Sequence, residues 1–322
     1  PEDLEAAEKA FEQGEDQLPV IEEQQRRMII RFLAMIRNID TQLGSLRSFL
    51  ADRGVDRDTI FIFLTDNGST FGPLYYNAGM RGAKCSLWEG GHRVPSFIRW
   101  PGGKMGASRD IDGLTEVQDL LPTLADLCEL EPSTAKLDGI SLAPVLRGEA
   151  DVPADRMLPV NYSRMPKADT PSPDNESIMR REGSAVLWKR WRLLEATALY
   201  NLDDDPEQEH NVIERYPEVA AKMTEALDAW WEEVEPVANE LQRIIIGHEA
   251  ENPMTLSSCE WQDVFVDQQK QVRLGVQKNS CWHLTAAHAG TYTFELRRWP
   301  RESNLTLAEA CGETRVTDGV LP

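Results

Sequence analysis

The feature that most constrains this chain is a short apolar run, IFIFL at residues 60–64, which leads into Asp66, Asn67 and Gly68. An uninterrupted apolar run of this length, bounded by polar residues, is typical of a strand covered on both faces in a parallel sheet. A buried helical turn gives the same pattern, but the two β-branched isoleucines and the glycine just beyond favour a strand. The sequence therefore predicts a buried strand that ends in polar side chains.

Asp66 and Asn67 follow this strand at its carboxyl end, which is where open α/β sheets place their ligands. Carboxylate and amide oxygens suit a hard cation such as Ca²⁺ or Mg²⁺ better than they suit zinc. Because Ca²⁺ takes ~6–8 oxygen ligands, further ligands must come from elsewhere in the fold, from substrate or from water. Asp-Asn-Gly after a strand is also typical of a plain turn, so both interpretations stay open on these residues alone.

The segments that follow the strand carry more information than the strand itself. Several ordered motifs at compatible spacing are far more specific than a single glycine pattern. In order, the chain carries TDNG at 65–68, a loop of small residues and tyrosines, GMRGAK at 79–84, EGGHRVP at 89–95 and WPGG at 100–103. This order resembles the sulfatase family of the alkaline-phosphatase-like superfamily. The resemblance covers about residues 19–236 and is strongest over 59–103.

In that family the Asp-Asn pair binds a divalent cation, usually calcium, and the lysine of the RG-x-K element contacts the sulfate. The resemblance therefore implies that Asp66 and Asn67 are ligands of Ca²⁺, or alternatively of Mg²⁺, and that Lys84 contacts the sulfate. The chemistry of the residues agrees, because a lysine ammonium is a point charge suited to an anionic oxygen and the metal adds a second positive centre. We expect Glu89 and Arg93 to brace their loop and His92 to be a solvated histidine.

The patterning and the resemblance together imply an α/β fold. It would be a partial doubly wound sheet of the alkaline-phosphatase-like type, followed by a small antiparallel sheet with a helix and then a β-rich C-terminal extension. We expect residues 1–150 to be the C-terminal part of the sulfatase catalytic domain, 151–240 its small C-terminal subdomain and 241–322 the extension.

Periodicity predicts the individual elements. Apolar residues at helical spacing predict a long amphipathic helix over 19–51 that lies on the sheet, and a second strand is expected within 94–100. Short antiparallel strands are expected over 184–202, followed by a helix that begins at Pro217. In the extension, Trp261, Trp282 and Trp299 could form a platform that stacks on sugars, but packing is favoured for these rings.

Composition excludes some classes of partner. The 322 residues include 54 Asp and Glu against 34 Lys and Arg, and the resulting charge of −20 repels nucleic acid and anionic membranes. No apolar run approaches the ~18 residues of a transmembrane helix, and no signal peptide opens the chain. Five cysteines without a CxxC pair do not indicate zinc, and pairs among Cys259, Cys281 and Cys311 are favoured for any disulfide. The oligomeric state is not indicated.

Part of the family's machinery is absent from this chain. Sulfatases depend on a formylglycine made from the Cys or Ser that opens a C/S-x-P/A-x-R motif, and no cysteine here fits. Cys311 precedes Arg315 at the right offset, but Glu313 stands where Pro or Ala belongs. The N-terminal Asp-Asp ligands and the histidine and lysine elements that precede the TDNG strand are missing too. The resemblance therefore implies the C-terminal portion of a sulfatase whose nucleophile half lies upstream, and this chain alone is expected to be inactive.

The expected function of the parent protein is metal-dependent cleavage of sulfate esters on a sulfated small molecule or carbohydrate. A phosphonate or phosphodiester hydrolase of the same superfamily is one alternative, because Asp-Asn metal binding is shared, and a non-catalytic truncated module is another. RG-x-K followed by EGG-x-RVP favours the sulfatase. The resemblance also implies a periplasmic or secreted protein whose exporting leader would lie upstream.

Overall fold

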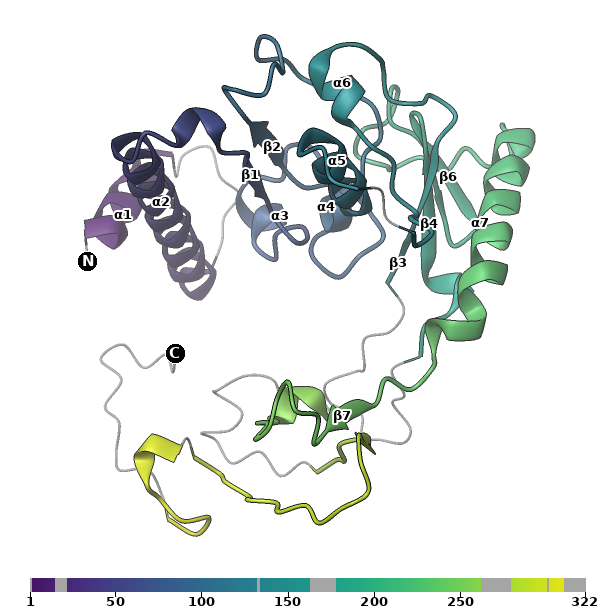
Figure 1. The fold of residues 1–322 in the computed structure, drawn as a ribbon. Coiled ribbons are helices and arrows are strands. Elements are labelled where there is room, and N and C mark those ends of the chain that lie inside the picture. Colours follow the sequence, from purple (N-terminus) through teal and green to yellow (C-terminus); the bar gives the residue numbers. More distant parts are fainter. Residues whose placement is uncertain are drawn as a thin grey trace. The chain divides into compact units, whose positions relative to one another are not determined.

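The structure is a computed structural model that describes residues 2–14, 22–131, 134–162, 178–261, 279–299 and 301–309. The chain divides into two compact units. The first comprises Pro1–Ser163 with Arg180–Val234, and the second comprises Arg164–Met179 with Glu235–Pro322. Figure 1 labels the elements in chain order. The expected boundaries at residues 150 and 240 stay a prediction.

Two helices that pack against each other open the first unit, α1 (Glu2–Gly14) and α2 (Glu23–Asp52) (Figure 1). The second confirms the long helix expected over 19–51. On its inner face Ile29 and Ile30 are buried against Phe11 of α1 and against Leu74, which lies in α3 (Gly72–Tyr75). Another part of its apolar stripe is exposed, and this part includes Met28, Met35, Ile36, Ile39, Leu46 and Phe49.

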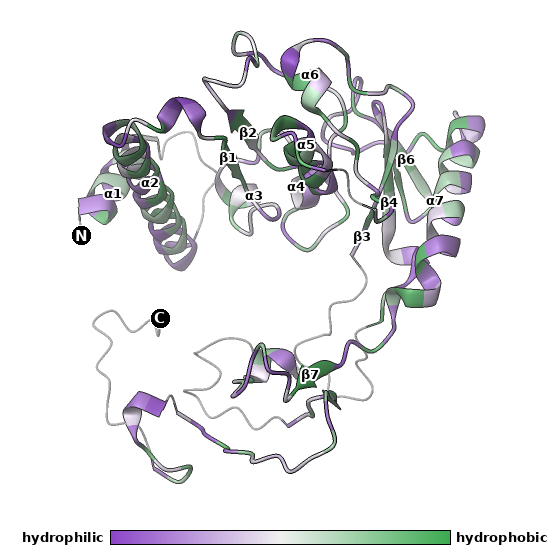
Figure 2. Ribbon diagram, in the orientation of Figure 1, coloured by the Kyte–Doolittle hydropathy of each residue, from purple (hydrophilic) through white to green (hydrophobic). Residues whose placement is uncertain are grey.

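The strand expected at residues 60–64 forms as β1 (Phe61–Leu64), and the one expected within 94–100 forms as β2 (Ser96–Arg99). Figure 2 colours β1 as hydrophobic along its length. The two strands pair antiparallel, and all four residues of β1 are half-buried. The expectation of parallel neighbours and full burial is therefore wrong for the described residues. An apolar run indicates a strand, but the number and direction of its neighbours depend on segments far away in sequence.

A buried carboxylate organises the region between β2 and the next sheet. Asp119 ends the short helix η3 (Val117–Asp119), which runs into α5 (Leu120–Leu127). It is fully buried, accepts hydrogen bonds from the backbone N–H groups of Glu116 and Ile140, and lies 2.6 Å from the Arg156 guanidinium. Burial alone would raise the pKa of Asp119, but these bonds outweigh it and hold the pKa below its usual value. Asp119 thereby holds the segment between α5 and α6 (Ala143–Arg147), through Ile140, against the start of α5.

Four antiparallel strands and one helix form the rest of the first unit. The strands lie in the order β3 (Met157–Asn161), β4 (Ser184–Trp188), β5 (Trp191–Leu194) and β6 (Ala198–Asn201), and α7 (Pro217–Ala238) packs on them. Val186, Leu193 and Leu199 of the sheet bury Met223 and Leu227 of the helix. The strands expected over 184–202 and the helix expected from Pro217 are confirmed.

The second unit has little regular structure among its described residues. β7 (Ile244–Ile246) and β8 (Leu284–Ala286) form a parallel pair of three residues each. Much of the pattern that predicts a β-rich extension falls on residues 262–278, which lie outside the described ones. The rings of Trp261 and Trp282 lie 5.6 Å apart, edge to face, and Trp282 donates its indole N–H to the Ser257 carbonyl. These contacts favour packing over an open platform for this pair.

Two further expectations can be compared with the described residues. Cys281 is a free thiol 3.4 Å from the His283 ring, so it forms no disulfide with Cys259. Cys311, and with it Arg315, lies outside the described residues. Where the structure describes the chain, no helix is both long and apolar enough to cross a membrane.

Candidate active site

Asp66 and Asn67 lie in the turn that directly follows β1. The Asn67 side-chain amide donates a 2.7 Å hydrogen bond to Asp66 Oδ2, so the two side chains face each other. Asp66 is exposed and Asn67 is half-buried. A half-turn of the Asn67 amide would exchange its nitrogen and oxygen and so present two oxygens to one cation.

The turn is held against a second segment by a close backbone approach. Gly68 donates its N–H to the carbonyl of Gly91 at 3.0 Å. A Cβ atom added to Gly68 would lie 1.7 Å from the Gly90 carbonyl oxygen, so only glycine fits at this position. Gly90 and Gly91 belong to α4 (Glu89–His92), the EGGH part of the second motif. The TDNG and EGGH motifs are therefore in direct contact.

The loop that carries Lys84 is fixed to the same turn. Lys84 donates its backbone N–H to the Ser69 carbonyl at 3.3 Å, and Gly90 donates to the Arg81 carbonyl at 2.8 Å. Asn77 stiffens the loop from inside, because its side-chain amide donates to the carbonyls of Met80 and Gly82. The structure thus brings the backbone of Lys84 next to Ser69, two residues beyond Asn67, and leaves the Lys84 side chain exposed.

The donor chemistry of Asp66 and Asn67 fits a hard cation, but the pair is only part of a site. Ca²⁺ takes ~6–8 oxygen ligands, and two side chains supply a minority of them. Within the part of the chain that the structure describes, no three His, Cys, Asp or Glu side chains are grouped so that they could hold a metal ion. The remaining ligands of such an ion would be other oxygens, from backbone carbonyls, further side chains, substrate or water.

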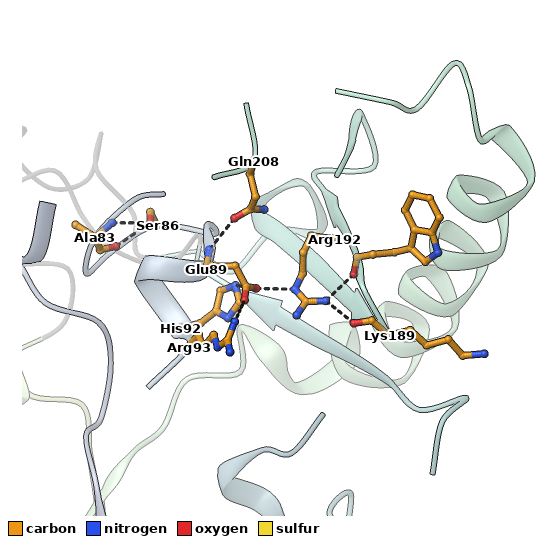
Figure 3. A network of polar contacts seen from close by, with 9 residues as sticks. Ala83, Ser86, Glu89, His92, Arg93, Lys189, Arg192 and Gln208 are labelled. Atoms are coloured by element: carbon orange, nitrogen blue, oxygen red, sulfur yellow. Dashed lines mark hydrogen bonds and ion pairs between the residues drawn. The ribbon is translucent and has the colours of Figure 1, made fainter. Parts of the chain in front are cut away.

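A buried charge network behind the loops was not foreseen from the sequence (Figure 3). Glu89 was expected to brace its own loop with Arg93, and that contact exists at 3.5 Å. The Glu89 carboxylate is only 1% exposed, however, and its shorter contact, at 2.5 Å, is with Nε of Arg192 on β5. Gln208, fully buried, accepts the Glu89 backbone N–H at 3.1 Å. The partners lie more than 100 residues from Glu89, and no local pattern links them.

The expectation of a solvated His92 is wrong. Its side chain is 13% exposed, and its ring lies 3.8 Å from the Glu89 carboxylate. Burial lowers the pKa of His92 and outweighs the opposite effect of Glu89, while Arg192 and Arg93 lower it further. The sequence places His92 one helical turn from Glu89. No local pattern indicates that Arg192 pairs with Glu89 and acts on His92.

The chain is similar in sequence to known sulfatases. The family model described as Sulfatase matches residues 2–130. Steryl-sulfatase of Mus musculus is 34% identical over 124 residues, which make up 36% of this chain and 20% of that protein. A sulfatase of Formosa agariphila is 28% identical over 217 residues, or 62% of this chain and 39% of that protein. The chain thus spans well under half the length of these relatives.

The fold is similar to those of solved structures. The crystal structure of Ps i-CgsB in complex with k-i-k-neocarrahexaose gives a TM-score of 0.55 at 21% sequence identity. The match covers 70% of this chain and 46% of that chain. Matches of this kind confirm the expected α/β fold of the alkaline-phosphatase-like type.

The contact between Gly68 and Gly90 can be tested by substitution. We expect Gly68→Ala to lower the free energy of unfolding by about 3 kcal/mol, because the added methyl group pushes two backbones apart. Gly44→Ala is the matched control. Nothing lies within 4 Å of a Cβ at this helical position, so the change should raise stability by about 1 kcal/mol. Urea denaturation followed by circular dichroism measures both, and a Gly68→Ala variant as stable as the natural chain would contradict the contact.

Proposed function

We propose that this chain, whose residues 2–130 match the family model described as Sulfatase, is part of a hydrolase that cleaves sulfate esters. The observation that carries the proposal is the backbone bridge between the two motif loops. The backbone N–H of Gly68 donates to the Gly91 carbonyl, and the backbone N–H of Lys84 donates to the Ser69 carbonyl. The loop that carries Asp66 and Asn67 is therefore in contact with the loop that carries Lys84. This is the juxtaposition that binding of one anion by a cation and an ammonium group requires.

Each of the three residues has a proposed role. Asp66 and Asn67 hold a divalent cation, Ca²⁺ or alternatively Mg²⁺, through their side-chain oxygens. When bound, such a cation polarises a sulfate oxygen and stabilises the charge that develops during hydrolysis. Lys84 neutralises the negative charge of the sulfate and holds the ester in place. We assign the nucleophile, a formylglycine, to a part of the protein outside this chain.

We further propose that the substrate is a sulfated small molecule or carbohydrate, and that the protein is periplasmic or secreted. The names of the relatives support a sulfate ester, and one matched structure holds an oligosaccharide. The chain's charge of −20 repels a sulfated ligand at long range. Recognition must therefore depend on local positive charge, which the cation and Lys84 provide.

Exposed apolar surface supports the proposal that this chain is one portion of a larger α/β domain. Met35 of α2 is 64% exposed and Ile39 is 49% exposed, although they lie on one stripe of a long helix. β1 has one strand partner among the described residues. Further elements of such a domain would cover the stripe, and further strands beside β1 would complete the sheet. Because the nucleophile is assigned to another part of the protein, this chain by itself is inactive under this proposal.

The exposed stripe yields a paired test. In this chain alone, Met35→Glu combined with Ile39→Glu should leave thermal stability nearly unchanged, because both side chains already face water. In the complete protein the same pair should lower the melting temperature strongly, because the further elements would bury two unpaired carboxylates. Ile29→Glu, on the buried inner face, is the control that should destabilise both forms. Equal tolerance in the two forms would count against the missing elements.

Enzyme assays test the roles of the three residues. In the complete protein Lys84→Met should lower kcat/KM for an aryl sulfate about 10²–10³-fold, the usual cost of removing one charge-stabilising group. Asp66→Ala should raise the Ca²⁺ concentration needed for activity. Lys136→Met is the control, since Lys136 pairs with Glu233 on the surface and should leave the rate unchanged.

Three outcomes would overturn parts of this proposal. Unchanged turnover in the Lys84→Met variant would remove its role as a sulfate contact. Turnover by this chain alone would show that it does not need a nucleophile from elsewhere. A preference for an aryl phosphonate over an aryl sulfate in the complete protein would favour the phosphonate hydrolase instead.

A further inference from the structure

Three residues of the network in Figure 3 fasten the Lys84 loop to the four-stranded sheet. On one side, Arg192 donates through Nε to Glu89, and through Nη1 to the backbone carbonyls of Lys189 and Trp191. Its guanidinium is therefore fixed by the sheet while it holds the carboxylate. Both side chains are almost completely buried, so solvent does not weaken the contact.

Gln208 makes the second attachment. It lies beyond β6, is fully buried, and adopts a left-handed backbone conformation with φ of 52°. Its side-chain oxygen accepts a hydrogen bond from the backbone N–H of Glu89. Its backbone carbonyl oxygen accepts a 2.6 Å hydrogen bond from Arg81 Nη1. The Arg81 guanidinium also lies 3.8 Å from the centre of the Trp88 ring. One residue thus holds the segment 81–89 at both of its ends.

These attachments lie on either side of Lys84. Arg81 precedes it by three residues and Glu89 follows it by five, so the loop between them has fixed ends. The same segment positions the metal-binding candidates, because Gly91 accepts the Gly68 N–H. Both candidate loops are therefore held in place by contacts with β5 and with the segment that follows β6.

Stability alone is a poor reason for such an arrangement. Replacing a buried ion pair by well-packed apolar residues is often neutral or stabilising, because two charges must be removed from water. What a hydrogen-bonded ion pair adds over apolar contacts is direction, because the N–H group must point at the carboxylate oxygen. The network is therefore better suited to setting the position of the loop than to raising the stability of the fold.

We propose that Glu89, Arg192 and Gln208 are positioning residues that hold the loop of Lys84 against the loop of Asp66 and Asn67. Their relevance to catalysis rests on the function proposed above, but the placement of the loops does not. The four-stranded sheet therefore sets the position of the anion site.

Amide hydrogen exchange tests the placement directly and needs no ligand. Glu89→Gln keeps the shape of the side chain and removes its charge, and Gln208→Met removes the acceptor for the Glu89 N–H. In either variant the amides of Gly68, Lys84 and Gly90 should exchange at least tenfold faster, while the amides of β4, β5 and β6 keep their rates. If both variants leave the three loop amides as protected as in the natural chain, the proposal is wrong.

Asp119→Asn is the matched control for a purely structural effect. Asp119 is also fully buried and paired with an arginine, Arg156 at 2.6 Å, but its hydrogen bonds are with Glu116, Ile140 and Arg156 and with neither of the two loops. We expect this variant to lose melting temperature as Glu89→Gln does, without selective exchange at the three loop amides. Equal exchange profiles in the Asp119→Asn and Glu89→Gln variants would reduce Glu89 to a structural role and overturn the proposal.

A binding measurement separates this inference from the proposed function. With Ca²⁺ saturating, inorganic sulfate is titrated into the complete protein, and binding is followed by the NMR signals of Lys84. Glu89→Gln should weaken sulfate binding about tenfold at temperatures where the variant is fully folded, and Asp119→Asn should not. Equal sulfate affinity in the natural protein and the Glu89→Gln variant would overturn the positioning role. Absence of sulfate binding by the natural protein would instead count against the role of Lys84, and the exchange result would still decide the placement.

Discussion

The close approach of Gly68 to Gly90 and Gly91 is the constraint on which the proposed site depends. A Cβ at Gly68 would sit 1.7 Å from a backbone oxygen, so any other residue would force the two motifs apart. With glycine present, the turn after β1 and the helix α4 share a backbone hydrogen bond. This contact turns two motifs separated in sequence into neighbours in space.

Electrostatics gives the second constraint. The chain as a whole is strongly acidic, and yet the sulfate proposed as its ligand is an anion. The charges nearest the loops show how this conflict can be resolved. Glu89 is neutralised by Arg192 and approached by Arg93, and His92 is kept uncharged by burial. The exposed ammonium of Lys84 is then free to act on an anion, with a metal ion as the second positive centre.

Much of the fold could be predicted from local sequence, and the reason lies in periodicity. The apolar spacing in α2 and the IFIFL run of β1 each indicate the type of their own element, because the period of the apolar residues follows the backbone geometry. Sheet partners were less accessible, because the antiparallel pairing of β1 with β2 depends on a segment more than thirty residues away. The residues of the candidate site were proposed from motif order, but the attachment through Arg192 and Gln208 could not be predicted. Those two residues belong to no motif, and only the folded chain brings them to Glu89.

The central claim is that Asp66, Asn67 and Lys84 serve one site around a divalent ion. Mn²⁺ accepts the same carboxylate and carbonyl oxygens as Ca²⁺, and its unpaired electrons broaden the NMR signals of nearby nuclei. When Mn²⁺ is titrated into this chain, the side-chain signal of Lys84 should broaden before those of Lys136 and Lys222, and Asp66→Ala should abolish the difference. A Lys84 signal that stays sharp while Mn²⁺ binds, or broadening that is equal for all three lysines, would contradict the account.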